Sequence, residues 1–400
     1  MAAAATRLYF ITFPGSADLF LLRTFSERMV DVGPRDYYLA DYQHYLPGYL
    51  YVFWGIGEFI RFFFPNPSNE TYFFILRIPP NLIDMATAFL IFKIVSKWAS
   101  PRWAVAAPAL YLFNPAVLYN TGPWGQFDTV PTFLMLLAVY LLLEKKPELS
   151  AGLLAYAFLV KAQTLAIIPL YSLALVLKTP PKRIVLSAAV AGAALFFIQL
   201  PFFLDDPFLG MYKLTREIEE NYPFVSVNGW NLWEIYGGWP KSDTETWLGI
   251  SLQGWGIVLW LSAQAAAGFW MFKRGVDNWS VYWASALVLF AFFILPTRIH
   301  ERYLFPFFAF FLVSALLSRW PVPLLGLYGV ISVLHFFNLY YVEQEKPYPI
   351  LEPLFNFVLK QDVAISCALV AAFVALLAGT LAAQFLRVRI RQEQASVPSG

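Results

Sequence analysis

The sequence predicts an all-α, polytopic membrane protein with about eleven transmembrane helices and further juxtamembrane helices in a large first loop. Hydrophobic residues make up 59% of the 400 residues and charged residues only 14%, which is too little charge to cover a soluble protein of this size. Apolar runs of about 20 residues, the length that crosses a bilayer, recur between residues 73 and 386. Short basic clusters separate these runs, so we expect one integral membrane domain over residues 1–400.

The basic clusters predict the topology, because Lys and Arg are retained in cytoplasmic loops close to the membrane. These clusters are Lys93, Lys97 and Arg102; Lys145 and Lys146; Lys178, Lys182 and Arg183; Lys273 and Arg274; Arg319; and Arg387, Arg389 and Arg391. One crossing precedes the first cluster, and two crossings fit between each consecutive pair. The predicted crossings are 73–96, 103–118, 129–143, 150–162, 164–177, 184–203, 248–272, 280–296, 303–318, 321–341 and 362–386. The loop inside each pair then lies on the non-cytoplasmic side, and 387–400 forms a cytoplasmic tail.

Residues 16–72 form the large first external loop in this topology. The apolar stretch 48–64 within it contains Glu58 and Arg61 and many aromatic residues, which favours a helix that lies in or dips into the membrane interface. The topology also requires a spanning helix before this loop, and residues 1–15 are too short to provide one. We therefore expect either a start further upstream or a remnant of a helix at residues 1–15.

Polar side chains gather in the predicted external loops, where a membrane protein uses them to line a cavity or to pair with one another. Asp18 follows Pro14-Gly15-Ser16, which can cap a helix and place the carboxylate near its positive end. Asp128 ends the sequence Trp124-Gly125-Gln126-Phe127-Asp128 and is predicted either to cap the next helix or to join a site. Lys161, in a tight turn, is predicted either to snorkel to the interface or to join the same site.

The densest polar segment between two apolar runs is Thr297-Arg298-Ile299-His300-Glu301-Arg302. Two guanidinium groups and an imidazole on one short turn suit a phosphate, because the Arg fork binds phosphate oxygens in pairs. The alternative is a plain loop in which Glu301 neutralises one of the two arginines.

Other classes of site are disfavoured by what the sequence lacks. Three distant histidines and one cysteine provide no zinc-ligand spacing, so we predict no metal, although carboxylate binding of Mg²⁺ or Mn²⁺ at Asp18, Asp36 or Asp41 stays open. No phosphate loop or dinucleotide fingerprint occurs, so we expect no cofactor and disfavour ATP-driven transport. The net charge of +2 is scattered, so a nucleic-acid partner is not expected.

Taken in order, these motifs resemble those of GT-C glycosyltransferases, in particular the prokaryotic polyprenyl-phosphate-mannose transferases and the dolichyl-phosphate-glucose transferases. The motifs that carry the resemblance are Asp18; Val32-Gly33-Pro34; Tyr45-Leu46-Pro47-Gly48-Tyr49; Arg77-Ile78-Pro79 with Asp84; Asn114-Pro115 through Asp128; Lys161-Ala162-Gln163; Ser226-Val227-Asn228; Asn231-Leu232-Trp233; and His300-Glu301-Arg302-Tyr303. The sequence departs from the family pattern at Ala162, where a proline is usual, and at His44, where a carboxylate is most often found.

The resemblance implies an inverting transfer of a hexose, mannose or glucose, from a polyprenyl-phosphate carrier to a lipid-linked or glycan acceptor. The reaction would take place on the non-cytoplasmic face of a multi-pass protein surrounded by membrane lipids, in the cell membrane of a prokaryote. The implied roles are Asp18 as general base, with Asp41 as a second catalytic carboxylate; His300, Arg302, Arg298 and Lys161 on the donor phosphate; and Asp36, His44, Gln126, Asp128, Asn228 and Trp233 on the sugar or acceptor.

Two alternatives come from other classes of protein. A transporter or flippase of lipid-linked sugars would place functional polar residues at the bilayer midplane in repeated halves. A noncatalytic scaffold subunit would leave Asp18 and His300 replaceable. The polar residues instead crowd the outer ends of the predicted helices, which favours the enzyme over the transporter.

Overall fold

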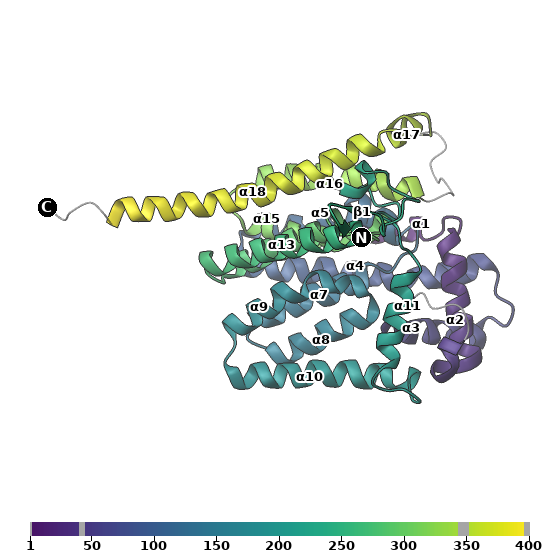
Figure 1. The fold of residues 1–400 in the computed structure, drawn as a ribbon. Helices are drawn as coiled ribbons and strands as arrows, with labels where there is room; N and C mark the ends of the chain where they lie inside the picture. Colours follow the sequence, from purple (N-terminus) through teal and green to yellow (C-terminus); the bar gives the residue numbers. More distant parts are fainter. Residues whose placement is uncertain (1, 40–44, 343–351, 396–400) are drawn as a thin grey trace.

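The computed structural model describes residues 2–39, 45–342 and 352–395, and this part of the chain is almost entirely helical. Eighteen α-helices lie within these ranges, together with one two-stranded hairpin, so the predicted all-α class is confirmed. Figure 1 shows the long helices side by side in one bundle, with α2 and α11 lying across one of its ends.

The elements follow one another in this order. The α-helices are α1 (Ala2–Phe10), α2 (Ala17–Asp36), α3 (Pro47–Phe63), α4 (Asn69–Trp98), α5 (Pro101–Leu112), α6 (Pro115–Thr121), α7 (Thr129–Leu143), α8 (Pro147–Val160), α9 (Ile168–Lys178), α10 (Pro181–Gln199), α11 (Gly210–Glu220), α12 (Leu232–Ile235), α13 (Leu252–Arg274), α14 (Asn278–Ile294), α15 (Phe305–Leu317), α16 (Pro321–Val342), α17 (Glu352–Leu359) and α18 (Asp362–Ala395). The 3₁₀ turns are η1 (Tyr37–Leu39), η2 (Ala162–Ala166), η3 (Leu200–Phe202) and η4 (Glu301–Leu304), and the hairpin pairs β1 (Thr246–Trp247) with β2 (Ile250–Ser251).

The predicted number of crossings is wrong. Within the described ranges, five helices are long and apolar enough to span a membrane, not eleven: α4, α10 with η3, α13, α16 and α18. Each of the other predicted crossings does coincide with helix. These helices are shorter than a membrane-spanning helix, because proline and capping residues end them. The run 103–118, for example, is divided where Asn114 accepts a hydrogen bond from the Val117 amide and Pro115 begins α6.

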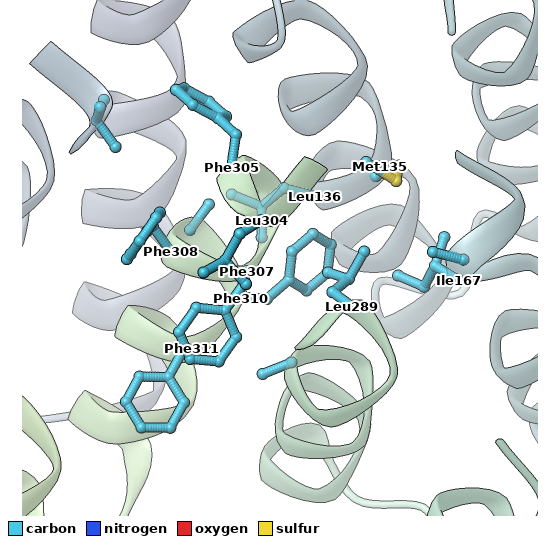
Figure 2. Packing of buried hydrophobic residues seen from close by; sticks show 14 of the residues in the cluster. Met135, Leu136, Ile167, Leu289, Leu304, Phe305, Phe307, Phe308, Phe310 and Phe311 are labelled. Atoms are coloured by element: carbon cyan, nitrogen blue, oxygen red, sulfur yellow. The ribbon is translucent and has the colours of Figure 1, made fainter. Parts of the chain in front are cut away.

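Helix α15 is the centre of the bundle. Its residues from Phe305 to Leu316 are all buried, as expected for a helix that is apolar on every face. It packs against α4, α5, α7, α14 and α16. Figure 2 shows its phenylalanines among side chains of neighbouring helices, and Phe307 lies 4.7 Å from Phe290 and 4.8 Å from Phe311 between ring centroids. The packed aromatic column gives the surrounding helices a common rigid support.

The predicted cytoplasmic loops meet at one end of the bundle. The Lys97 ammonium lies 2.5 Å from the Glu144 carboxylate, which joins the α4–α5 and α7–α8 connections. Arg183, at the start of α10, binds Glu148 at 2.6 Å, and the Lys178 ammonium donates to the Val276 carbonyl at 2.7 Å. Connections that the charge pattern placed on one side of the membrane are therefore linked in space.

The predicted external loops meet at the other end. Ser16 donates a hydrogen bond to the carbonyl of Trp124 at 2.9 Å, and Val227 pairs with His300 in a short bridge. The described loops that were predicted to be external thus contact one another, and the side of the membrane on which they lie stays a prediction. Figure 1 shows this second end at the right, where α2, α11 and α17 lie.

A buried polar cluster attaches α1 to the bundle. Arg7, only 3% exposed, lies 2.5 Å from Asp84 and also donates to Asn81 and Thr121 at 3.0 Å. The hydroxyl of Tyr111 donates to the other Asp84 oxygen at 3.2 Å. Because a buried ion pair is favourable only when further hydrogen bonds satisfy both partners, these contacts allow Arg7 to lie inside the bundle.

Candidate functional site

The carboxylate of Asp18 lies in the first turn of α2, at the end of the bundle where the external loops meet. Ser16 is the N-cap of this helix, as predicted, because its hydroxyl oxygen accepts a hydrogen bond from the Leu19 amide. The same hydroxyl donates to the Trp124 carbonyl at 2.9 Å. One serine therefore both starts the helix and attaches it to the Trp124–Asp128 loop.

Two side chains of that loop hold one oxygen of Asp18. The indole nitrogen of Trp124 donates to Oδ2 at 3.0 Å, and the amide nitrogen of Gln126 donates to the same oxygen. Oδ1 accepts no hydrogen bond from any residue that the structure describes, and the side chain is half-buried. The carboxylate is thus fixed in orientation while its second oxygen is open to an incoming group.

Arg77, on α4, fixes the chain on both sides of this contact. Its side chain is 1% exposed and donates to the carbonyls of Ile11 at 3.2 Å, Phe13 at 2.7 Å, Pro14 at 2.8 Å and Pro123 at 2.5 Å. The first three carbonyls precede α2 and the fourth precedes the Trp124 indole. A guanidinium that ties both segments determines where the helix start and the loop meet.

Lys161 and Asp128 form an ion pair in the interior. Their side chains are 6% and 0% exposed, and the ammonium contacts Oδ1 of the carboxylate. Asp128 makes no side-chain capping bond to α7, and Lys161 does not reach for the interface, so the capping and snorkelling alternatives are both wrong. Burial lowers the pKa of Lys161 to about 8, and the neighbouring Asp128 carboxylate opposes this shift.

Glu301 and Arg302 form the second buried pair, with Nη1 of the guanidinium 2.7 Å from the carboxylate. The predicted neutralisation of one arginine by Glu301 is confirmed, but the loop is not a plain solvated one. Arg302 lies within electrostatic range of Asp18 and Asp128, and its Nε has no hydrogen-bond partner in the described ranges. The guanidinium therefore retains one donor without a hydrogen-bond partner in the described ranges.

His300 lies beside these pairs as a neutral ring. Its backbone forms short bridges with Val227 and Asn228, and its ring lies 5.2 Å from that of Tyr222 and 5.3 Å from that of Tyr303. Burial, and then the nearby positive charges, lower the pKa of His300 well below its usual range. The imidazole can consequently bind a phosphate through an N–H hydrogen bond but not as a cation.

Four distant parts of the chain supply these groups. Lys161 acts electrostatically on His300 and on Glu301, and Asp18 acts on Glu301 and on Tyr45. The structure thus brings the start of α2, the Trp124–Asp128 loop, the turn after α8 and the hexamer before α15 into one charge cluster.

Two predicted site residues have structural partners instead. Arg298 holds the carboxylate of Asp243 with Nε at 2.6 Å and Nη2 at 3.2 Å, so its fork is already occupied. The indole of Trp233 donates to the Leu295 carbonyl at 2.7 Å and packs with Val225, so its face is part of a small core. The predicted phosphate role of Arg298 and sugar role of Trp233 do not fit these positions.

Of the remaining predicted site residues, some lie near the charge cluster and others do not. Asn228 lies next to the His300 backbone, and its carbonyl accepts a hydrogen bond from Asn338 at 2.8 Å. The Asp36 side chain is exposed, its carbonyl is held by Arg28, and the kink of α2 at Gly33 lies between it and Asp18. Within the described residues, no hydrogen bond or ion pair joins the Asp36 side chain to the cluster. Asp41 and His44 lie outside the described residues.

Neither Trp124 nor Gln163 is among the site residues predicted from the sequence. Trp124 binds Asp18 directly, and the Gln163 side chain, 3% exposed, has neither its amide nitrogen nor its oxygen bonded within the described ranges. Both stand inside motifs already noted for Gln126 and Lys161. The signal that indicates them is that each polar side chain follows an apolar helix by only a few residues.

The Tyr45–Tyr49 signature packs against the segments that carry the charge cluster. Pro47 begins α3, and the ring of Tyr49 stacks on Phe127 with centroids 4.0 Å apart. A Cβ on Gly48 would lie 2.6 Å from backbone atoms at the end of α8, so only glycine allows α3 to approach this closely. The signature therefore sets the position of the residues that immediately precede Asp128 and Lys161.

The described residues contain no group of three or more metal-ligating side chains, and Asp18 and Asp36 do not come together. What the cluster offers chemically is an oriented carboxylate, two paired cations and several unbonded polar atoms. Comparison with known protein families and with curated proteins finds no match for this chain.

We predict that Gly48→Ala destabilises the protein by about 1–3 kcal/mol, because the backbone of α8 must move to admit the methyl group. Gly55→Ala on the same helix is the control, because a methyl group there would meet no atom within 4 Å and alanine has the higher helix propensity. Thermal unfolding of the detergent-solubilised protein measures both. Equal melting temperatures for the two variants would contradict the close-approach argument.

Proposed function

We propose that this protein is an inverting hexosyltransferase of the GT-C class that uses a polyprenyl-phosphate-linked sugar as donor. The observation that carries the proposal is the position of Asp18, whose carboxylate is oriented by Trp124 and Gln126 within electrostatic range of Arg302, which is itself within range of Lys161. A carboxylate with one open oxygen can receive a proton, and cations and N–H donors can stabilise a departing phosphate.

In the proposed reaction, an acceptor hydroxyl oxygen bonds to the anomeric carbon while the bond from that carbon to the phosphate oxygen breaks. The configuration inverts, the hydroxyl proton passes to Oδ1 of Asp18, and the electron pair leaves with the lipid phosphate. Arg302, Lys161 and the neutral His300 would bind the phosphate, and the unbonded amide of Gln163 is available to the sugar or the phosphate.

The charge balance of the cluster supports this direction of proton transfer. Two cationic and three anionic side chains give it a formal charge of −1, since each of Asp128 and Glu301 already pairs with a cation. Protonation of Asp18 removes one negative charge as the leaving phosphate gains one. The net charge of site and substrate therefore stays constant during the transfer, and the neighbouring cations can stabilise the charge that develops on the phosphate.

The arrangement in the membrane also suits a lipid-linked substrate. The chain has five membrane-length helices, and the basic connections lie at the end of the bundle opposite to the site. By the distribution of Lys and Arg, the site would face the non-cytoplasmic side of the membrane. The resemblance to prokaryotic transferases favours the cell membrane of a prokaryote. The polyprenyl chain would remain among the helices while the sugar and the lipid-linked or glycan acceptor meet at the surface.

We predict that Asp18→Asn lowers the transfer rate at least about 100-fold, because general base catalysis contributes that much or more. Donor binding should change little, since the amide keeps the shape of the side chain. The assay incubates purified protein with a labelled polyprenyl-phosphate hexose and an acceptor lipid and measures the new glycoside. Asp36→Asn, at an exposed side chain, is the matched control and should leave the rate unchanged.

Normal turnover by Asp18→Asn would falsify the assignment of the base. Donor movement across liposomes without formation of a glycoside would indicate a transporter, and neither activity with the wild-type protein would indicate a scaffold subunit.

We predict that kcat/KM for the donor decreases as the pH rises through about 8, because Lys161 loses its positive charge there. For one titrating group the decrease is about tenfold per pH unit above the pKa, and kcat/KM reports the free enzyme. Lys161→Arg keeps its charge throughout this range, so any activity it retains should lack the alkaline decrease. A flat wild-type profile between about pH 7 and pH 10 would rule out this role.

A further inference from the structure

A cavity of about 240 Å³ lies between α13, α14 and α18, at the end of the bundle opposite to the charge cluster. Three tryptophans form one wall: Trp270, Trp279 and Trp283. Their rings are in contact, with centroids 5.7 Å apart for the first pair and 5.5 Å for the second. Such a mainly apolar space is unsuited to ordered water, which needs two to four polar partners.

Helix α18 forms the opposite wall, and the small residues on this face of the helix leave the space in front of it unfilled. No atom lies within 4 Å of a Cβ placed on Gly379, and Ala375 and Ala383 line the same face. The indole of Trp283 donates to the Thr380 hydroxyl at 2.9 Å, which holds α18 in place and satisfies one polar group of the lining; the other polar lining residues are Arg274 and Gln384. The lining is therefore mainly apolar, and its small residues on α18 are exposed at the surface of the bundle.

The mouth of the cavity carries positive charge. Arg274 ends α13 and lines the cavity with its guanidinium 4.7 Å from the Trp279 ring centroid, whereas the ammonium of the neighbouring Lys273 lies over the Phe269 ring. Lys178 reaches the same loop through the Val276 carbonyl. Among the described side chains Asp277 lies 3.5 Å from Arg274, so Lys178, Arg274 and Asp277 together carry a formal charge of +1. An occupant with an anionic head and an apolar tail matches both parts of the site.

We infer that this cavity binds one anionic glycerophospholipid, with its phosphate at Arg274 and Lys178 and an acyl chain against the three tryptophans. Basic pockets between membrane helices on the cytoplasmic side are suited to such headgroups. The inference is independent of the proposed transferase activity, because none of its residues belongs to the charge cluster at the other end.

Native mass spectrometry of the full chain, titrated with phosphatidylglycerol or with phosphatidylcholine, tests the assignment. We expect one phosphatidylglycerol to bind at least about fivefold more tightly than phosphatidylcholine, the effect of about one basic group at a membrane surface. Gly379→Leu fills the cavity and should abolish this binding. Gly326→Leu, the same substitution at another exposed and uncrowded glycine, should leave it unchanged.

Arg274→Gln gives a second reading that does not depend on filling the cavity, because it should remove the preference for phosphatidylglycerol while phosphatidylcholine still binds. Equal affinity of the wild-type protein for both lipids, or unchanged phosphatidylglycerol binding by Gly379→Leu, overturns the inference. Melting temperatures within the wild-type range confirm that each variant tested is folded.

Discussion

Apart from the adjacent Glu301–Arg302 pair, the charges buried at the Asp18 end of this bundle find their partners on distant segments of the chain, and this constraint organises the region. An isolated charge in a low-dielectric interior is far more costly than a paired one. Lys161 after α8 pairs with Asp128 before α7, and Arg77 on α4 binds carbonyls on both sides of the start of α2. The ends of several helices are therefore held in fixed positions by polar contacts as well as by packing.

The polar contacts and the aromatic core act at different levels. The column of phenylalanines on α15 provides a support that is apolar on all sides and contributes no reacting group. Closer to the charge cluster, aromatic rings pack around Phe127 and hold the loop that contributes Gln126 and Asp128. Gly48 lets α3 approach closely enough for this packing. Support by rigid elements is what a site needs if its groups are to stay oriented before a substrate arrives.

The two ends of the molecule differ in how they use charge. At the external end, carboxylates and cations are buried and paired, with a few donors left unbonded. At the other end, Lys97, Arg183 and Arg274 are more exposed and lie at the rim of the bundle, where each is accessible to lipid headgroups or solvent. The first arrangement favours positioning of reacting groups, and the second favours orientation of the protein in the bilayer.

The sequence by itself determined where the helices lie, which loops share an end, and that Asp18 and Lys161 belong to a polar region. These properties follow from apolar runs and charge patterns, which are local. Only the tertiary structure decided which side chains are available. Arg298 and Arg302 are four residues apart, yet Asp243 occupies the fork of one, while the other pairs with Glu301 within electrostatic range of Asp18. Such partners are chosen by contacts between segments far apart in the chain, and no local pattern records them.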